Sequence, residues 1–207
     1  MKVVHIDPES SYEFPIVAIG NFDGVHRGHQ ELIRRILAKA DEWDERASVL
    51  TFSPHPMKVL CPARAPRLLM SNAEKASFLG HMGVDAMLVY PFTVGFAKMA
   101  PRAFAAEVLE RLGVRYAVVG YNFSFGSNGS GTPAMLSELG HEYGFEVDVV
   151  PEQRFGNVSI SSTEIRKALA FGDVDKAVAL MGHSDADVRL LPPGSFEAMH
   201  ETDLTTC

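Results

Sequence analysis

Two histidines three residues apart are the most chemically informative side chains of this 207-residue chain. His26 and His29 belong to GNFDGVHRGHQ (20–30), which follows the apolar run PIVAIG (15–20) and precedes apolar residues at helical spacing. This pattern predicts a buried strand, a tight turn and a helix. Backbone N–H groups and the positive end of the helix dipole meet at such a turn and favour an anion. Imidazoles titrate near neutral pH, so we expect the charge of both rings to respond to a phosphate.

A metal site is the main alternative for this pair, because residues i and i+3 share a helix face. No third or fourth ligand stands at suitable spacing nearby, so the sequence predicts no metal held by the protein itself. A plain polar helix start would explain either histidine alone. The turn carries neither G-x-x-x-x-G-K-[ST] nor G-x-G-x-x-G. The residues around the pair still favour an anion site: Gly20, Asp23, Gly24 and Gly28.

The composition is that of an ordinary globular protein, with 46% hydrophobic and 22% charged residues. We expect one main domain over residues 1–185 and an unassigned tail over 186–207. The net charge of −7 and the absence of a basic run argue against nucleic-acid binding. Two cysteines are too few for a disulfide framework or a zinc cluster, and no apolar run is long enough to cross a membrane. We therefore expect a soluble, cytoplasmic protein; its oligomeric state stays open.

Strand-like apolar runs alternate with helix-like stretches along the chain. The runs lie at 47–52, 85–92, 115–120 and 145–150, and the helical stretches near 73–81, 101–112 and 133–143. This alternation predicts an α/β, Rossmann-like fold with a mostly parallel sheet and helices on both faces. Ligands of such open sheets bind beyond the carboxyl ends of the strands.

Polar motifs follow several of these runs, so we expect them to meet at one edge of the sheet. They are GNFDGVHRGH, SPHP (53–56), GYNFSFG (120–126) and SISSTEIR, whose first residues (from 159) we read as a last short strand. Ser161, Ser162 and Thr163 are typical of a helix cap. Arg166, one turn into that helix, can reach back and bind an anion as a fork. Two helix starts that favour anions suit a triphosphate better than a single phosphate.

Four motifs follow one another along the chain in this order: GNFDGVHRGHQ, TFSPHP, GYNFSFG with Gly131, and ISSTEIR. Together, over about residues 14–183, they resemble the adenylyltransferase module of prokaryotic bifunctional riboflavin kinase/FAD synthetases. The resemblance implies a Rossmann-like nucleotidyltransferase fold. It also implies transfer of AMP from ATP to FMN, giving FAD and pyrophosphate, with Mg²⁺ accompanying the ATP. The phosphate of FMN is already ionised at neutral pH, so alignment and charge stabilisation replace a general base.

The resemblance further implies roles for individual residues. The two histidines contact the triphosphate, and the start of the last helix holds the departing pyrophosphate. The catalytic set is then His26, His29, Asn122, Ser162, Thr163 and Arg166. ATP is bound by Gly20, Asn21, Phe22, Asp23, Gly24, Gly28, Gly120 and Ser161. FMN is bound by Ser53, Pro54, His55, Pro56, Phe123 and Phe125, where the two phenylalanines either stack on the isoalloxazine ring or fill the core.

Two departures from the family pattern leave other functions open. The loop SNGSG (127–131) carries no Lys or Arg where relatives usually place basic residues. After Gly182 nothing resembles the Pro-Thr-Ala-Asn signature of the riboflavin kinase domain, so we expect that domain to be missing. The alternatives are a related nucleotidyltransferase with another acceptor, and a catalytically weak protein that binds a flavin or a nucleotide.

Overall fold

The computed structural model describes residues 1–183, so the expected tail over 186–207 lies outside the described residues. Its main sheet has six strands in the order β1-β4-β3-β2-β5-β6, and every neighbouring pair is parallel. The strands are β1 (Lys2–His5), β2 (Ile16–Ile19), β3 (Ala47–Ser53), β4 (Ala86–Pro91), β5 (Tyr116–Gly120) and β6 (Glu146–Val150). The predicted α/β fold with a mostly parallel sheet is confirmed.

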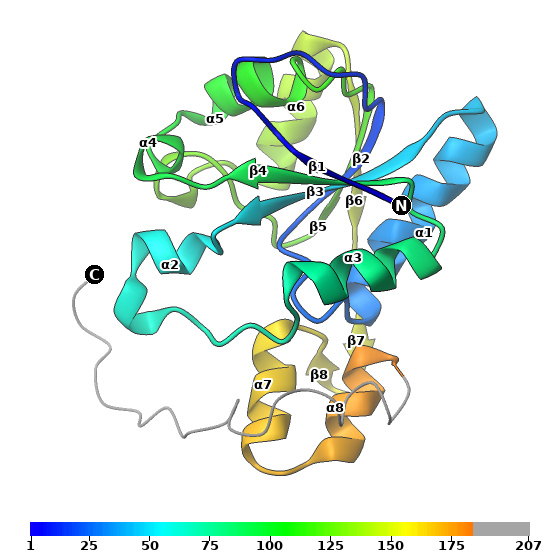
Figure 1. Ribbon diagram of the computed structural model, residues 1–207, viewed down its shortest axis with the longest axis vertical. Coiled ribbons are helices and arrows are strands. Elements are labelled where there is room, and N and C mark those ends of the chain that lie inside the picture. Colours follow the sequence, from blue (N-terminus) through cyan, green and yellow to red (C-terminus); the bar gives the residue numbers. More distant parts are fainter. Residues whose placement is uncertain (184–207) are drawn as a thin grey trace.

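Helices cover both faces of this sheet (Figure 1). They are α1 (Arg27–Trp43), α2 (Pro56–Leu60), α3 (Asn72–His81), α4 (Val94–Ala97), α5 (Pro101–Ala103), α6 (Pro133–Tyr143), α7 (Ser162–Ala170) and α8 (Val174–Met181), with the short η1 (Pro62–Arg64) and η3 (Ser127–Gly129). The predicted helix at 101–112 is instead one turn of α-helix, α5, followed by the π-helix η2 (Phe104–Leu109). None of the helices in residues 1–183 is both long and apolar enough to cross a membrane.

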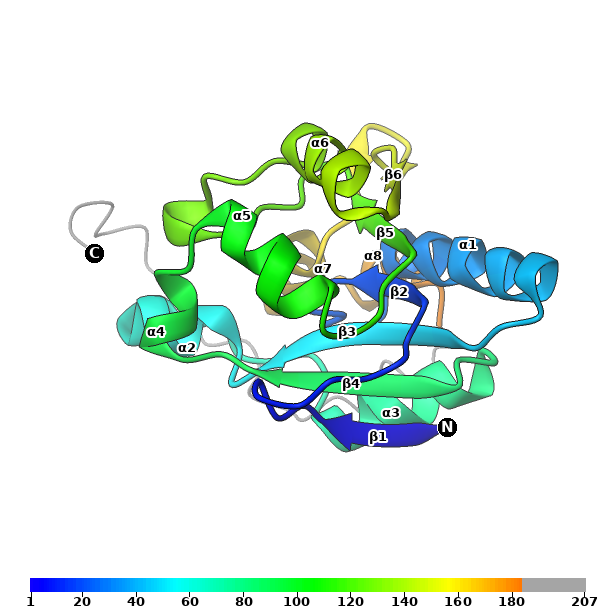
Figure 2. The same cartoon turned by 90° about the horizontal axis from the view of Figure 1, so that it is seen from above.

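The strands are buried on both faces, which is why they read as continuous apolar runs. In β2, Ile16 and Ala18 pack with α1, α3, α7 and α8, whereas Val17 and Ile19 pack with η2 and α6. Figure 2 shows the sheet from above, with β4 lying between β1 and β3. Two apolar cores therefore hold the central strands in place.

The sheet reverses its winding direction beside β2. From β2 the chain builds outward through β3 and β4, and it then returns to the other side of β2 to form β5 and β6. In open α/β sheets, ligands bind beyond the carboxyl ends of the strands at such a reversal. Here those two carboxyl ends carry GNFDGVH and GYNFSFG.

The short strand expected from residue 159 is present, at Val158–Ser159, but its expected place in the main sheet is wrong. β7 (Arg154–Phe155) and β8 (Val158–Ser159) pair with each other as an antiparallel hairpin. Gly156 at its turn has φ +57°, and Gly-Asn is a favoured two-residue hairpin turn. The local turn chemistry thus outweighs extension of the parallel sheet, and α7 follows directly from the hairpin.

Candidate functional site

The turn between β2 and α1 has an unusual backbone. Phe22 and Val25 have φ values of +49° and +35°, and Gly24 between them has +81°. Positive φ is strained for a bulky or β-branched residue, and such strain concentrates at functional sites. A larger residue at Gly24 would be strained by this positive φ, and its Cβ would lie 2.7 Å from Cδ1 of Leu69, which would have to move. This turn places His26 directly before the first residue of α1.

The two histidines form a stacked pair. His26 is the N-cap of α1, and its Nδ1 accepts a hydrogen bond from the backbone N–H of His29 at 3.4 Å. The ring centroids lie 3.7 Å apart with an interplanar angle of 17°. A Cβ on Gly28 would lie 3.1 Å from the His26 ring, which explains the glycine between them. Since Nδ1 of His26 is an acceptor, its Nε2 carries the proton and is a donor.

Burial keeps both rings uncharged at neutral pH. Burial lowers the pKa of His26 to about 4; a backbone hydrogen bond opposes this shift, and smaller electrostatic effects of His183 and Arg166 add to it. Burial, followed by His26 and Lys75, lowers the pKa of His29 well below its ordinary value. In the free protein, desolvation thus works against a charge on either ring at neutral pH, and the expected response of the rings to a bound phosphate stays a prediction.

One atom of this pair has no hydrogen-bond partner. Nδ1 of His29 is buried, and within residues 1–183 nothing donates to it or accepts from it. Leaving a buried polar group unsatisfied costs about 1–3 kcal/mol, so such groups are rare and need an explanation. A polar ligand at this turn offers one.

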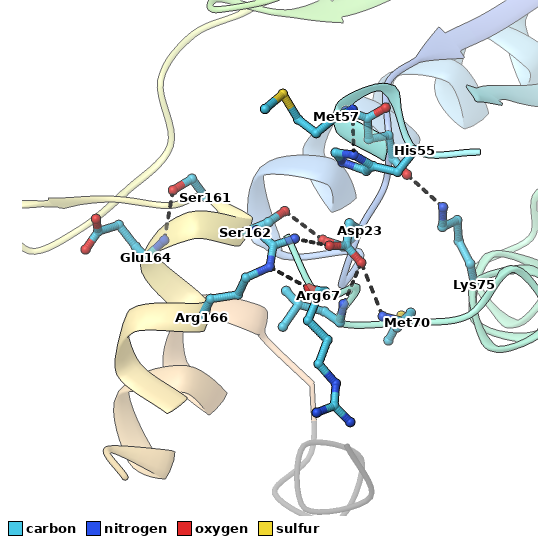
Figure 3. A network of polar contacts seen from close by, with 12 residues as sticks. Asp23, His55, Met57, Arg67, Met70, Lys75, Ser161, Ser162, Glu164 and Arg166 are labelled. Carbon is cyan, nitrogen blue, oxygen red and sulfur yellow. Dashed lines mark hydrogen bonds and ion pairs between the residues drawn. The ribbon is translucent and has the colours of Figure 1, made fainter. Parts of the chain in front are cut away.

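Asp23 is a structural clamp. Its side chain is 2% exposed, and Oδ1 accepts hydrogen bonds from the backbone N–H groups of Leu69, at 2.8 Å, and Met70, at 3.2 Å. Its Oδ2 forms an ion pair with Arg166 (Figure 3). Protein donors thus already engage both carboxylate oxygens, and the expected contact of Asp23 with ATP stays a prediction. The side chain of Phe22 is fully buried in the core, and the expected contact of this residue with ATP stays a prediction.

The start of α7 is docked onto this turn. Ser161 is the N-cap and accepts from the N–H of Glu164 at 3.2 Å, while the hydroxyl of Ser162 donates to the Asp23 carbonyl at 2.8 Å. Arg166 donates through Nε to the Arg67 carbonyl at 2.8 Å and through Nη2 to Asp23. These contacts leave the Nη1 amino group of Arg166 without a protein partner in the described chain. Its guanidinium therefore both joins two segments and keeps donors for an anion.

The motif after β3 places a third histidine at the same edge. Ser53 and Pro54 are joined by a cis peptide bond, and Pro56 begins α2. His55 caps α2, with Nδ1 accepting from the N–H of Met57 at 3.2 Å, so its Nε2 is also a donor in the neutral ring. Burial lowers the pKa of His55, against an opposing effect of the Asp23 carboxylate.

The two phenylalanines of the motif after β5 differ in burial. Phe123 and Phe125 stack with centroids 5.5 Å apart, but Phe125 is 6% exposed and packs on Phe104 at 5.2 Å. Of the two alternatives for Phe125, its burial favours the core role, which Gly131 permits because a Cβ there would lie 2.7 Å from the ring. Phe123 is only partly buried.

Asn122 lies at the end of the strand beside β2 and is exposed. A Cβ on Gly120 would lie 3.4 Å from its Oδ1. Across residues 1–183 no hydrogen bond links Asn122 to the histidine pair. The structure thus joins the first and fourth motifs directly, through Asp23. The hydroxyl groups of Tyr121 and Ser159, 3.3 Å apart, link the β5 motif to the fourth, and the hydroxyl of Thr51 in β3 donates to the carbonyl of Asn21 in the first.

Sequence reasoning missed Lys75 of α3. Its side chain is 5% exposed, and its Nζ donates to the carbonyl of Asn21 at 2.8 Å. The available signal was its spacing: Lys75 lies four residues before the buried Leu79, so it occupies the apolar face of α3. It also missed the segment before α3, whose Arg67, Leu69 and Met70 backbone groups hold Arg166 and Asp23.

Comparison with known proteins finds a match to the family model described as FAD synthetase over residues 9–164. A protein of Listeria monocytogenes is 37% identical over 169 residues, which cover 81% of this chain and 54% of that protein. One of Escherichia coli is 35% identical over 186 residues, covering 88% and 59%. Both are named bifunctional riboflavin kinase/FMN adenylyltransferase, and this chain spans little more than half their length.

Two solved structures resemble the fold. One, titled macrolide-efflux protein and from Streptococcus pneumoniae, is 28% identical with a TM-score of 0.76, covering 88% of this chain and 62% of the other. The other is a pantoate-beta-alanine ligase of Francisella tularensis, 14% identical with a TM-score of 0.51, covering 80% and 71%. At that identity the second likeness concerns the fold alone.

Proposed function

Because the chain belongs to the FAD synthetase family, we propose that it is an FMN adenylyltransferase that transfers AMP from ATP to FMN and releases pyrophosphate. The observation that carries this proposal is the stacked, uncharged pair His26 and His29, with its unpartnered buried nitrogen, at the point where the sheet reverses. A polyphosphate bound there meets imidazole donors, the N-terminus of α1 and the docked start of α7.

The reaction needs little covalent help from the protein. A phosphate oxygen of FMN attacks the α-phosphorus of ATP, a new P–O bond forms, and the bond from that phosphorus to the bridging oxygen breaks. The electron pair leaves with pyrophosphate. A phosphate monoester is mostly dianionic at neutral pH, so no general base is required. Catalysis then consists of alignment and of stabilising the charge that develops on the phosphates.

The histidine pair stabilises this charge. Neutral imidazoles donate hydrogen bonds without carrying a charge of their own, and His26 has its Nε2–H free for this because Nδ1 caps α1. His29 brings its unpartnered nitrogen to the same phosphates. Donors fixed in advance by a helix cap and a ring stack need no reorganisation during the reaction.

The start of α7 receives the departing pyrophosphate. The hydroxyl of Thr163 is on an exposed residue, and Arg166 contributes its Nη1 amino group. Ser162 acts through the turn, since its hydroxyl already donates to the Asp23 carbonyl. Asp23 keeps the guanidinium in place, which makes it a positioning residue.

FMN binds at the ends of β3 and β5 in this proposal. The Nε2–H of His55 and the amide of Asn122 orient its phosphate, and Phe123 contacts the isoalloxazine ring. The described residues offer no group of three His, Cys, Asp or Glu that could hold a metal. We infer that Mg²⁺ would accompany ATP, because phosphate oxygens are ligands that it prefers, and that it would supply positive charge to the phosphates.

The test is incubation of the purified chain with ATP, Mg²⁺ and either FMN or riboflavin, with chromatography of the flavins. We expect FAD from FMN and no FMN or FAD from riboflavin, whose neutral hydroxyl would need a general base. His29→Ala should lower kcat on the order of 100-fold, as the loss of one preorganised donor does. His81→Ala, which alters an exposed histidine of α3, should keep full activity.

Three results would count against the proposal. Absence of FAD with the wild-type chain would favour another acceptor or a binding protein. FMN made from riboflavin would contradict the inferred nucleophile. Equal rates for wild type and His29→Ala would remove this turn from catalysis.

A further inference from the structure

Lys75 is a buried cation that the proposed mechanism does not use. Its side chain is 5% exposed, on the face of α3 that also buries Leu79. Lysine is almost never buried without a charged partner, because desolvating an ammonium ion is expensive. Its burial therefore needs a reason other than packing.

Within residues 1–183, no carboxylate lies within ion-pair distance of the Lys75 ammonium, whose hydrogen-bond acceptor is the carbonyl of Asn21, 2.8 Å away. That carbonyl also accepts from the hydroxyl of Thr51, at 3.2 Å. Lys75 is thus not needed to satisfy Asn21. An ammonium has three N–H donors, and two of these have no acceptor among the described residues.

The charge lies among the residues that the proposal assigns to phosphates. Figure 3 shows the Lys75 side chain pointing from α3 toward the region between His55 and Asp23. Burial lowers the pKa of His29 and of His55, and the positive charge of Lys75 contributes to both shifts. Burial also lowers the pKa of Lys75, and the Asp23 carboxylate, already paired with Arg166, opposes this only in part. The free protein thus carries more positive than negative charge behind this turn.

We propose that Lys75 recognises the polyphosphate of the nucleotide, supplying from behind the Asn21 turn a buried positive charge that a bound triphosphate neutralises. The inference rests on the proposed function for the identity of the nucleotide as ATP. Lys75 is then kept for affinity at the expense of stability. Replacing a buried charge by an apolar side chain of similar length often leaves stability unchanged or raises it. Replacing a lysine that the fold needs would instead lower the stability.

The test compares Lys75→Met with Lys75→Gln and with a control, Lys2→Met, in β1. Lys2 is exposed and lies at the amino end of its strand, away from the carboxyl edge. Urea unfolding measures stability, and calorimetry with MgATP and with AMP measures binding. Neither readout depends on whether FAD is formed.

We expect both Lys75 variants to be at least as stable as wild type and to bind ATP about tenfold or more weakly, with a loss of no more than about threefold for AMP. Lys2→Met should match wild type in both measurements. Equal losses for ATP and AMP, unchanged ATP affinity, or a Lys75→Met variant less stable than wild type would each overturn the inference. A wild-type chain that binds ATP but makes no FAD would refute the proposed function alone.

Discussion

His26 should make the stability of the folded protein depend on pH over a defined range. Burial lowers its pKa from 6.5 to about 4. Between these values the unfolded chain binds a proton that the folded chain excludes. The stabilisation is therefore complete above about pH 6.5 and is lost as the pH falls toward about 4. At about 1.36 kcal/mol per pH unit, the whole difference corresponds to about 3 kcal/mol.

The assay is urea unfolding at pH 7.5 and at pH 5.0, for wild type and for His26→Asn. Asparagine is a good N-cap, so the variant keeps an acceptor for the first turn of α1 but removes the titrating ring. Linkage predicts that protonation of His26 alone lowers the free energy of unfolding of the wild type by about 2 kcal/mol between pH 7.5 and pH 5.0. Carboxylates and other histidines contribute to both proteins, so the difference between the two losses isolates His26.

Wild type should thus lose about 2 kcal/mol more than His26→Asn on acidification. Equal losses in the two proteins would refute the reasoning, because they would show that the His26 ring is not desolvated in the folded state. A greater loss in the variant would contradict the sign of the shift.

Three further outcomes test the contacts around the turn. Asp23→Asn removes one partner of a buried ion pair and should lower the free energy of unfolding by about 3–5 kcal/mol; a loss under about 1 kcal/mol would mean that the clamp is not formed. Arg166→Lys keeps the charge but cannot donate at once to Arg67, Asp23 and an anion, so FAD cleavage driven by pyrophosphate should slow markedly; an unchanged rate would remove Arg166 from the site. Phe123→Ala should raise KM for FMN with little change in stability, whereas Phe125→Ala should lower the free energy of unfolding by about 3–5 kcal/mol. The reverse pattern would contradict the assignment of Phe123 to FMN and of Phe125 to the core.

Much of the fold could be predicted because its strands and helices have local signatures. β2, β3, β4 and β5 are continuous apolar runs, and α6 begins at Thr132 and Pro133, as a cap followed by proline predicts. β1 was missed because its four residues are mostly exposed, and only pairing with the distant β4 makes them a strand. The hairpin of β7 and β8 was misassigned because two short strands carry too little pattern to name their partner.

The site was predictable only at the level of residue types. The spacing of His26 and His29 placed both rings correctly on one turn, but their low pKa values come from burial that no local pattern reports. The pairing of Asp23 with Arg166 joins residues 143 positions apart, so it follows from tertiary packing. Lys75 was overlooked for the same reason, since one lysine on an apolar helix face becomes informative only when its neighbours are known.

The central claim, attack of the FMN phosphate on the α-phosphorus of ATP, is tested most directly by following labelled phosphorus. The purified chain is given FMN and Mg²⁺ with ATP labelled at either the α- or the γ-phosphate, and flavins and pyrophosphate are separated. The account predicts that the α-label appears in FAD and the γ-label only in pyrophosphate. Transfer of the γ-label to a flavin, or no transfer of the α-label to FMN, would contradict it.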